Sequence, residues 1–182
     1  MNFKIQSLLL TLIIISCAPA PSRMAETNPE ELIKKADSLI TQHPNDIELR
    51  NAIVAAHLRL AKKNNEPSHY KSILKFEPNN KSANYFFNIQ KGKTHHKKGH
   101  KNGQWDAIQS FAKAAALIDT LGEAYYWLGQ AYEKKDEMDF ELPLESYDKA
   151  LSLYLDNDMR SKTSSARLAL LKRKKTYEDF WK

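Results

Sequence analysis

The sequence has few of the residues on which many folds and catalytic sites depend. Cys17 is its only cysteine, which excludes an internal disulfide and any site built from several thiolates. Only five of the 182 residues are glycine, and no stretch shows the strict alternation of apolar and polar residues that marks a half-buried strand. A glycine-rich phosphate loop, a Gly-x-Ser-x-Gly motif and a His-Glu-x-x-His motif are also missing. We therefore predict an all-α protein that is not an enzyme and carries no cofactor or metal.

The segment from Met1 to Ser16 is predicted to be a signal peptide. Lys4 precedes an apolar run from Leu8 to Ile15 that only Thr11 interrupts. This run is shorter than the roughly 20 apolar residues that span a bilayer, but it has the length of a signal-peptide core. It leads into Ile14-Ile15-Ser16-Cys17, which resembles the lipobox of bacterial lipoproteins. The resemblance implies cleavage before Cys17 and lipidation of its sulfur; the alternative is an ordinary secretory signal followed by a chance cysteine.

Residues 17–28 are predicted to be a lipid-anchored, flexible tether. They include Pro19 and Pro21 among small residues, and they show no helical periodicity. No acidic pair follows Cys17, and position 18 is alanine rather than aspartate. By comparison with the sorting signals of lipoprotein families, these features predict a place in the cell envelope, on the outer membrane and facing the periplasm.

The remaining sequence predicts helices separated by short breaks. Apolar residues recur at helical spacing, and proline, asparagine, aspartate or glycine interrupts the pattern between segments. The predicted helices span about 29–43, 46–64, 68–77, 105–118, 122–134, 140–155 and 159–180, with a further helix that begins near residue 81.

A repeat with a period of about 34 residues runs through this pattern. The break Pro44-Asn45-Asp46 recurs one such period later as Pro78-Asn79-Asn80. Further along, Tyr125-x2-Leu128-Gly129-x2-Tyr132 resembles the first-helix signature of the tetratricopeptide repeat (TPR) family, with Tyr125 in place of tryptophan. Two second-helix signatures flank it, Ala107-x3-Phe111-x2-Ala114 and Tyr147-x2-Ala150. The resemblance covers residues 29–156.

The TPR resemblance implies a right-handed superhelical array of antiparallel helix pairs, a TPR-like solenoid. Residues 157–182 would form a C-terminal capping helix that shields the apolar face of the last repeat. Family members bind proteins or peptides in the concave surface that their first helices line. Carried onto this sequence, the protein-binding groove would contain Tyr85, Ile89, Glu123, Tyr126, Gln130 and Glu133. The predicted function is a non-catalytic scaffold or adaptor, anchored to the membrane of the cell envelope.

The segment from Lys91 to Lys101 departs from the repeat pattern because it is longer than a turn between paired helices and carries three histidines, His95, His96 and His100, among its lysines. Either the preceding helix continues to Lys101, or it ends at Gly92 and a basic loop follows. The segment suggests an alternative function, an envelope protein that captures a metal ion or an anionic glycolipid. The formal charge of +6 permits contacts with anionic surfaces. Nucleic acid is not an expected partner in the envelope.

Replacement of Cys17 tests the predicted anchor. Because the acyl chains would be attached to the cysteine sulfur, the Cys17→Ser variant should either be released from membranes or remain unprocessed. Fractionation of cells, together with the mass of the protein, measures both properties. A variant that is cleaved normally and still sediments with membranes would refute the lipoprotein prediction.

Overall fold

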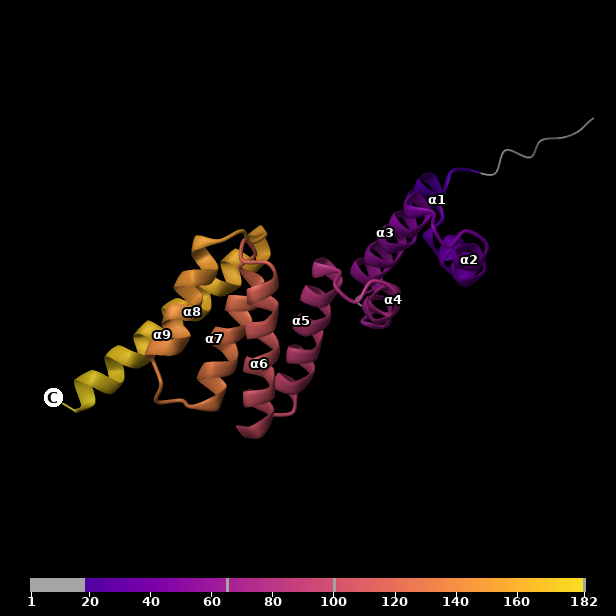
Figure 1. The fold of residues 1–182 in the computed structure, drawn as a ribbon. Coiled ribbons are helices and arrows are strands. Elements are labelled where there is room, and N and C mark those ends of the chain that lie inside the picture. The colour runs from indigo at the N-terminus through magenta and orange to yellow at the C-terminus, as the bar shows by residue number, and fades with distance from the viewer. Residues whose placement is uncertain (1–18, 65, 100, 182) are drawn as a thin grey trace, which may run out of the picture. The chain divides into compact units, whose positions relative to one another are not determined.

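The computed structural model describes residues 19–64, 66–99 and 101–181 (Figure 1). These residues form nine α-helices and one isolated β-bridge, and they contain no strand. The described part of the chain thus has the predicted all-α fold. Within the same residues, no helix is both long enough and apolar enough to cross a membrane. The predicted signal peptide and Cys17 lie outside the described residues.

The chain divides into two units, residues 1–56 and residues 57–182, and the boundary falls within helix α3 (Ile47–Asn64). The first unit contains α1 (Pro21–Thr27), α2 (Pro29–Gln42) and the first part of α3. Helix α1 packs on α2, and Ala25 is buried there. The prediction of a flexible, extended tether over residues 17–28 is therefore wrong for residues 21–27. Pro21 fixes a helical φ in the first turn, and burial of Ala25 favours the helix.

In the second unit, consecutive helices pack on one another along the chain. Each helix from α4 onward contacts the next, and in Figure 1 helices α5 to α8 lie side by side in chain order. Short turns join them, so neighbouring helices run antiparallel. The unit contains the end of α3 and then α4 (Ser68–Phe76), α5 (Lys81–Lys97), α6 (Lys101–Leu117), α7 (Glu123–Lys135), α8 (Glu141–Ser152) and α9 (Asn157–Phe180).

The repeat period seen in the sequence also appears in the hydrogen bonds that start two helices. Asp46 accepts from the backbone N–H of Leu49 at 2.9 Å, and one period later Asn80 accepts from the N–H of Ala83 at the same distance. In addition, Asn84 donates its side-chain amide to the carbonyl of Pro78, and Arg50 donates likewise to the carbonyl of Pro44. Each Pro-Asn break therefore ends one helix and supplies the N-cap of the next.

Two glycines allow paired helices to approach closely. A Cβ atom on Gly92 of α5 would lie 2.4 Å from Cε1 of Phe111 in α6, and a Cβ on Gly129 of α7 would lie 2.4 Å from Cε1 of Tyr147 in α8. In each pair the aromatic ring thus occupies the space that a side chain would fill. Phe111 and Tyr147 are both fully buried. The same glycine–aromatic contact is used in two successive helix pairs.

The connection that precedes α7 and the connection that follows α8 are hydrogen-bonded to each other. The backbone N–H of Gly122 donates to the carbonyl of Tyr154 at 2.9 Å, and the N–H of Tyr154 donates to the carbonyl of Thr120 at 3.1 Å. Arg160 of α9 donates to the carbonyls of Leu151 and Leu153, which satisfies acceptors at the end of α8. These bonds fix the start of α9 against the preceding helix pair.

The histidine-lysine segment is mostly helical. Helix α5 continues to Lys97, so the alternative in which it ends at Gly92 is wrong, and the alternative in which it reaches Lys101 places its end one turn too late. A turn containing Gly99, at φ 78°, leads into α6 at Lys101, one turn before the predicted start at Trp105. The extra residues of this segment therefore form the last turn of α5 and the first turn of α6, so both helices are longer than the repeat pattern requires.

Substitution of Gly129 tests the close approach of α7 and α8. Alanine favours a helix over glycine by about 1 kcal/mol, but its Cβ would overlap the Tyr147 ring, and overpacking costs about 1–3 kcal/mol. We therefore expect Gly129→Ala to lower the free energy of unfolding, as measured by urea denaturation. In a Tyr147→Leu background the same substitution should be neutral or stabilising. Equal losses in both backgrounds would show that the ring does not limit the approach.

Candidate binding groove

Every second helix of the second unit, α5, α7 and α9, contributes to one continuous face, which we call the groove. A pocket of about 520 Å³ lies in it and is lined from all three helices, by His96 of α5, by Gln130, Glu133, Lys134 and the following Glu137 of α7 and its loop, and by Ala166, Ala169 and Arg173 of α9. Helices α6 and α8 do not line this pocket. Two of these helices, α5 and α7, are ones that the TPR resemblance assigns to the binding surface, whereas α9 was expected only to cap the last repeat.

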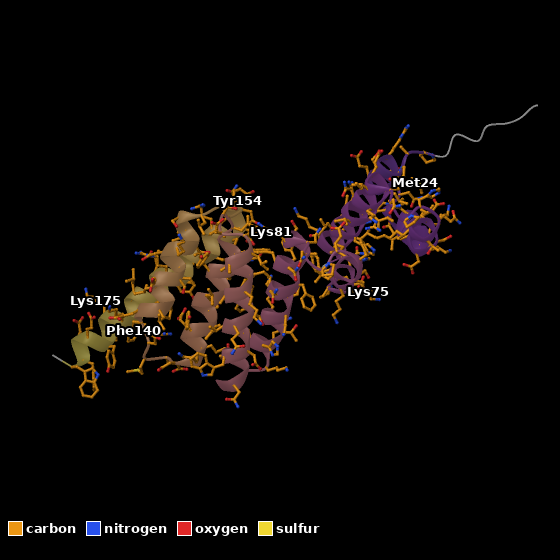
Figure 2. All side chains as sticks on the ribbon, viewed as in Figure 1. Met24, Lys75, Lys81, Phe140, Tyr154 and Lys175 are labelled. Carbon is orange, nitrogen blue, oxygen red and sulfur yellow. The ribbon has the colours of Figure 1, made fainter. Side chains whose placement is uncertain are left out.

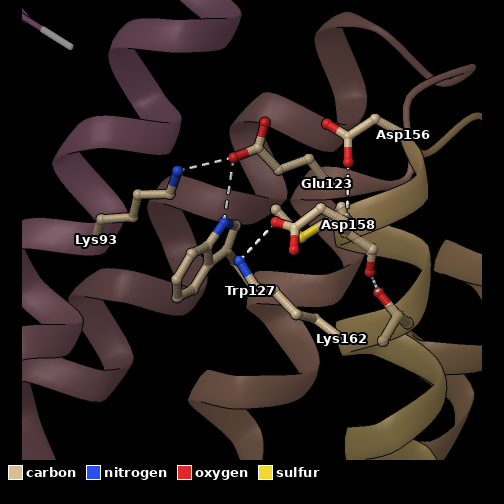
Figure 3. Close-up of polar contacts among 8 residues, drawn as sticks. Lys93, Glu123, Trp127, Asp156, Asp158 and Lys162 are labelled. Atoms are coloured by element: carbon tan, nitrogen blue, oxygen red, sulfur yellow. Dashed lines mark hydrogen bonds and ion pairs between the residues drawn. The ribbon is translucent and has the colours of Figure 1, made fainter.

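Lys93, Glu123 and Trp127 form an ordered cluster between α5 and α7 (Figure 3). The Lys93 Nζ donates to Glu123 Oε1 at 2.7 Å, and the indole Nε1 of Trp127 donates to the same oxygen at 3.2 Å. Lys93 Nζ also lies 4.9 Å from the centre of the Trp127 ring, within the range of a cation–π interaction. The lysine and glutamate side chains are only 25% and 27% exposed, so solvent screens this pair less than a surface ion pair.

A second polar cluster connects the groove to the buried core. The hydroxyl of Tyr147, from α8, donates to Glu133, and the side-chain amide of Gln130 donates to that hydroxyl. Arg173 of α9 forms an ion pair with Glu133 at 3.3 Å. Burial raises the pKa of the Tyr147 hydroxyl far above its usual value, and the hydrogen bond to Glu133 raises it further. Tyr147 therefore remains neutral and donates to one carboxylate oxygen of Glu133, while Arg173 forms its ion pair with the other.

His96 takes part in a partly buried hydrogen-bond pair with Gln104 rather than in a free cationic surface. Its Nδ1 lies 2.7 Å from Oε1 of Gln104, and Gln104 Nε2 donates to the His96 carbonyl at 3.1 Å. An amide oxygen only accepts, so Nδ1 carries the hydrogen. Burial lowers the pKa of His96, the hydrogen bond to Gln104 opposes this, and Lys134 lowers it again. Protonation of His96 on acidification therefore works against the folded state.

Helix α9 provides the other wall of the groove. Asp156 caps its first turn by accepting from the N–H of Met159, and Lys162 forms an ion pair with Asp158 at 2.6 Å (Figure 3). The ring of Tyr126, from α7, lies 5.1 Å from that of Trp127 in an edge-to-face arrangement. Burial raises the pKa of the Tyr126 hydroxyl. Tyr126 thus places an aromatic ring between the two polar clusters.

The structure separates the predicted groove residues into two groups. Gln130 and Glu133 line the pocket, Glu123 belongs to the Lys93 cluster, and Tyr126 is partly buried between them. Tyr85 and Ile89 are instead 0% and 1% exposed and belong to the hydrophobic core with Phe111 and Leu128. Both side chains lie on the buried side of α5, which packs against α6 and α7, so their assignment to the groove is wrong.

Several groove residues were not predicted from the sequence. Lys93 and His96 lie in the segment whose helix boundary could not be decided, and Arg173 lies in a helix outside the repeat pattern. Trp127 could have been found from the sequence, because it lies four residues after Glu123 on the same helix and residues at that spacing share one face.

The two described histidines of the basic segment, His95 and His96, belong to no metal site among the described residues. Among residues 19–64, 66–99 and 101–181, no group of three histidine, cysteine, aspartate or glutamate side chains is arranged to hold a metal ion. His95 Nδ1 lies 3.5 Å from Asp106, and the Nδ1 of His96 is hydrogen-bonded to Gln104. His100 lies outside the described residues.

Comparison with known proteins finds a similar solved structure but no matching family model or curated sequence. No family model matches the chain, and no curated protein matches its sequence. Among solved structures, the chain is similar to the crystal structure of MamA with 16% sequence identity and a TM-score of 0.44. The similarity covers 89% of this chain and 98% of that one.

Removal of Glu123 tests the groove cluster. The Glu123→Ala variant leaves the Lys93 ammonium and the Trp127 indole N–H without their shared acceptor in a partly buried place. We expect it to lower the free energy of unfolding by about 1–2 kcal/mol and to shift tryptophan fluorescence to longer wavelength. The control is Glu178→Ala, which removes an ion pair with Lys174 on the exposed surface of α9, where the two side chains are 50% and 34% exposed. That control should change stability little, and equal effects would indicate that burial adds nothing at Glu123.

Proposed function

We propose that this chain is a TPR-like, non-catalytic scaffold of the bacterial cell envelope, anchored to a membrane through Cys17. In this proposal the groove on α5, α7 and α9 binds a peptide or a helix of another protein. The observation that carries the proposal is the pocket of about 520 Å³, to which three helices separated in sequence each contribute side chains.

The chemistry of the groove supports a polypeptide partner. Trp127 and Tyr126 offer apolar ring surface, while Gln130, Lys134 and Glu137 offer donors and acceptors. Aromatic residues beside polar groups are typical of the centres of protein interfaces. The charged groups Glu133 and Arg173 are paired with each other, so the groove presents no concentrated charge of one sign. A polypeptide, which brings apolar side chains and backbone hydrogen-bonding groups together, matches this mixture.

The anchor is supported by the sequence alone. The apolar run and the lipobox-like Ile14-Ile15-Ser16-Cys17 precede the first described residue, and α1 begins soon afterwards at Pro21. An anchor so close to the first helix would hold the scaffold near the membrane surface. In this proposal, partners are recruited to the membrane rather than bound in free solution.

Charge exchange at the rim of the groove tests the proposed binding surface. Lys134 and Glu137 are exposed residues that line the pocket, so the variant Lys134→Glu, Glu137→Lys should lose partners without a change in net charge. The matched control is Glu145→Lys, Lys149→Glu, which exchanges exposed charges in a different cleft, between α7 and α8. Partners are identified by crosslinking in intact cells, purification of the full chain and mass spectrometry.

The proposal predicts a set of proteins that is captured by the wild type and by the control, and reduced about tenfold or more in the groove variant. Circular dichroism and thermal unfolding of all three proteins establish that each is folded. If the control variant lost the same proteins as the groove variant, or if only the control did, the groove would not be the binding surface.

A further inference from the structure

The last turns of α9 carry a face that the rest of the described chain leaves open. Phe180 is 78% exposed and Trp181 is 71% exposed, which is unusual for large aromatic side chains. Phe140, from the loop before α8, contacts this end of the helix through Tyr177, with ring centres 5.6 Å apart. Figure 2 labels Phe140 and, on α9, Lys175 at this end of the second unit. Beyond this contact, α9 extends past the helix pair on which it packs.

A shallow, mainly apolar pocket of about 560 Å³ lies along this open face. It is lined by one stripe of α9 with helical spacing, Ala169, Lys172, Arg173, Thr176, Tyr177 and Phe180. Ala169 and Thr176 are small, exposed and seven residues apart, so the backbone of another helix can approach closely between them. The stripe thus has room for a large side chain of another helix beside Ala169 and Thr176, and it presents a large side chain of its own, Phe180.

The charges beside this stripe have a regular order. Lys172 and Asp179 are exposed and seven residues apart, so at 100° per residue they lie on the same flank of the stripe. Glu178 and Lys174 lie on the opposite side of the helix, where they pair at 3.9 Å. Lys175 lies between that side and the flank, about 40° around the helix from Asp179. One flank of the open face therefore carries a positive charge near one end and a negative charge near the other.

We infer that this face of α9 binds the same face of a second copy of the chain, with the two helices antiparallel. Antiparallel pairing about a twofold axis near residues 175 and 176 places Lys172 of each copy beside Asp179 of the other, which gives two equivalent ion pairs. The same pairing places Phe180 of each copy near Ala169 and Lys172 of the other, in the pocket. The order of Lys172 and Asp179 and the space beside Ala169 thus suit a second copy of the same face.

The charge order favours a second copy over an anionic bilayer. Lysines beside exposed aromatic residues are also typical of helices that lie on membranes. On a bilayer, however, the Asp179 carboxylate beside Phe180 would be pressed against anionic headgroups. In the antiparallel pair the same carboxylate is matched by a lysine.

The pairing should be weak. It involves about three turns of helix, so it buries less surface than the roughly 1,600 Å² of a standard protein interface. A dissociation constant in the micromolar range, or higher, is therefore expected. The stripe shares Ala169 and Arg173 with the groove pocket, but the pairing does not require a peptide partner in the groove, because it concerns a second copy of the chain and the flank charges Lys172 and Asp179 lie outside that pocket.

A zero-length crosslinker tests the geometry directly. A carbodiimide joins an amine to a carboxylate only where the two are in contact, and Lys172 and Asp179 of one helix are separated by about 10 Å. The full chain in detergent is prepared with natural isotopes and with ¹⁵N, mixed, treated and analysed by mass spectrometry. A crosslinked peptide that joins Lys172 to Asp179 with mixed isotopes is the expected product. A Lys172–Asp179 product found solely within single copies, or no such product, would overturn the inference.

Charge exchange separates the pairing from nonspecific association. In sedimentation equilibrium of the full chain in density-matched detergent, Asp179→Lys and Lys172→Asp should each raise the dissociation constant about tenfold, and an equimolar mixture of the two should restore association. The control Glu178→Lys makes the same change of charge on the opposite side of α9 and should have little effect. A wild-type chain that stays monomeric to about 100 µM, or variants that associate equally well alone and mixed, would contradict the model.

Discussion

The close contact between a glycine on one helix and an aromatic ring on the next is the constraint on which the second unit depends. At Gly92 and again at Gly129, the missing side chain lets the ring of Phe111 or Tyr147 lie directly against the backbone of the preceding helix. This sets the distance within each pair. Because α7 packs on both α6 and α8, the two pairs are joined without an intervening layer. The result is that α5, α7 and α9 share one face, and the groove follows from this arrangement.

Tyr147 shows how the core and the groove are connected. Its ring fills the space beside Gly129, while its hydroxyl is bound to Glu133 and Gln130 at the floor of the groove. Glu133 is in turn paired with Arg173 of α9. A single buried side chain therefore determines helix spacing and also orients the polar groups that a partner would meet. Such preorganised groups lose less conformational entropy on binding than free side chains do.

Much of the fold, and less of the groove, could be predicted from the sequence. The breaks at Pro44 and Pro78 were identified by their spacing, and the caps at Asp46 and Asn80 follow from the residue types that suit those positions. Gly129 was identified from its motif, whereas Gly92 was not, because Lys91 precedes it where the family signature has leucine. Its role became clear only when α5 proved to continue to Lys97.

The errors in the groove have a physical cause. Tyr85 and Ile89 were assigned to it by analogy of position, but sequence spacing alone does not determine which side of α5 faces α6. Arg173 and Lys93 could not be found by repeat analysis, since one lies beyond the repeats and the other in a segment that departs from the pattern. The pairing of these cations with Glu133 and Glu123 depends on tertiary contacts between helices that are not neighbours in sequence.

The packing of each helix on the next also determines how the second unit would respond to mechanical force. From α4 to α9, the described contacts are almost entirely between consecutive helices, so no element holds the two ends of this unit together. If a membrane anchor held one end while a partner pulled on the other, the helices would separate in series from the weakest junction, each extension lowering the load on those that remain. The unit would then behave as an extensible connector rather than a rigid post.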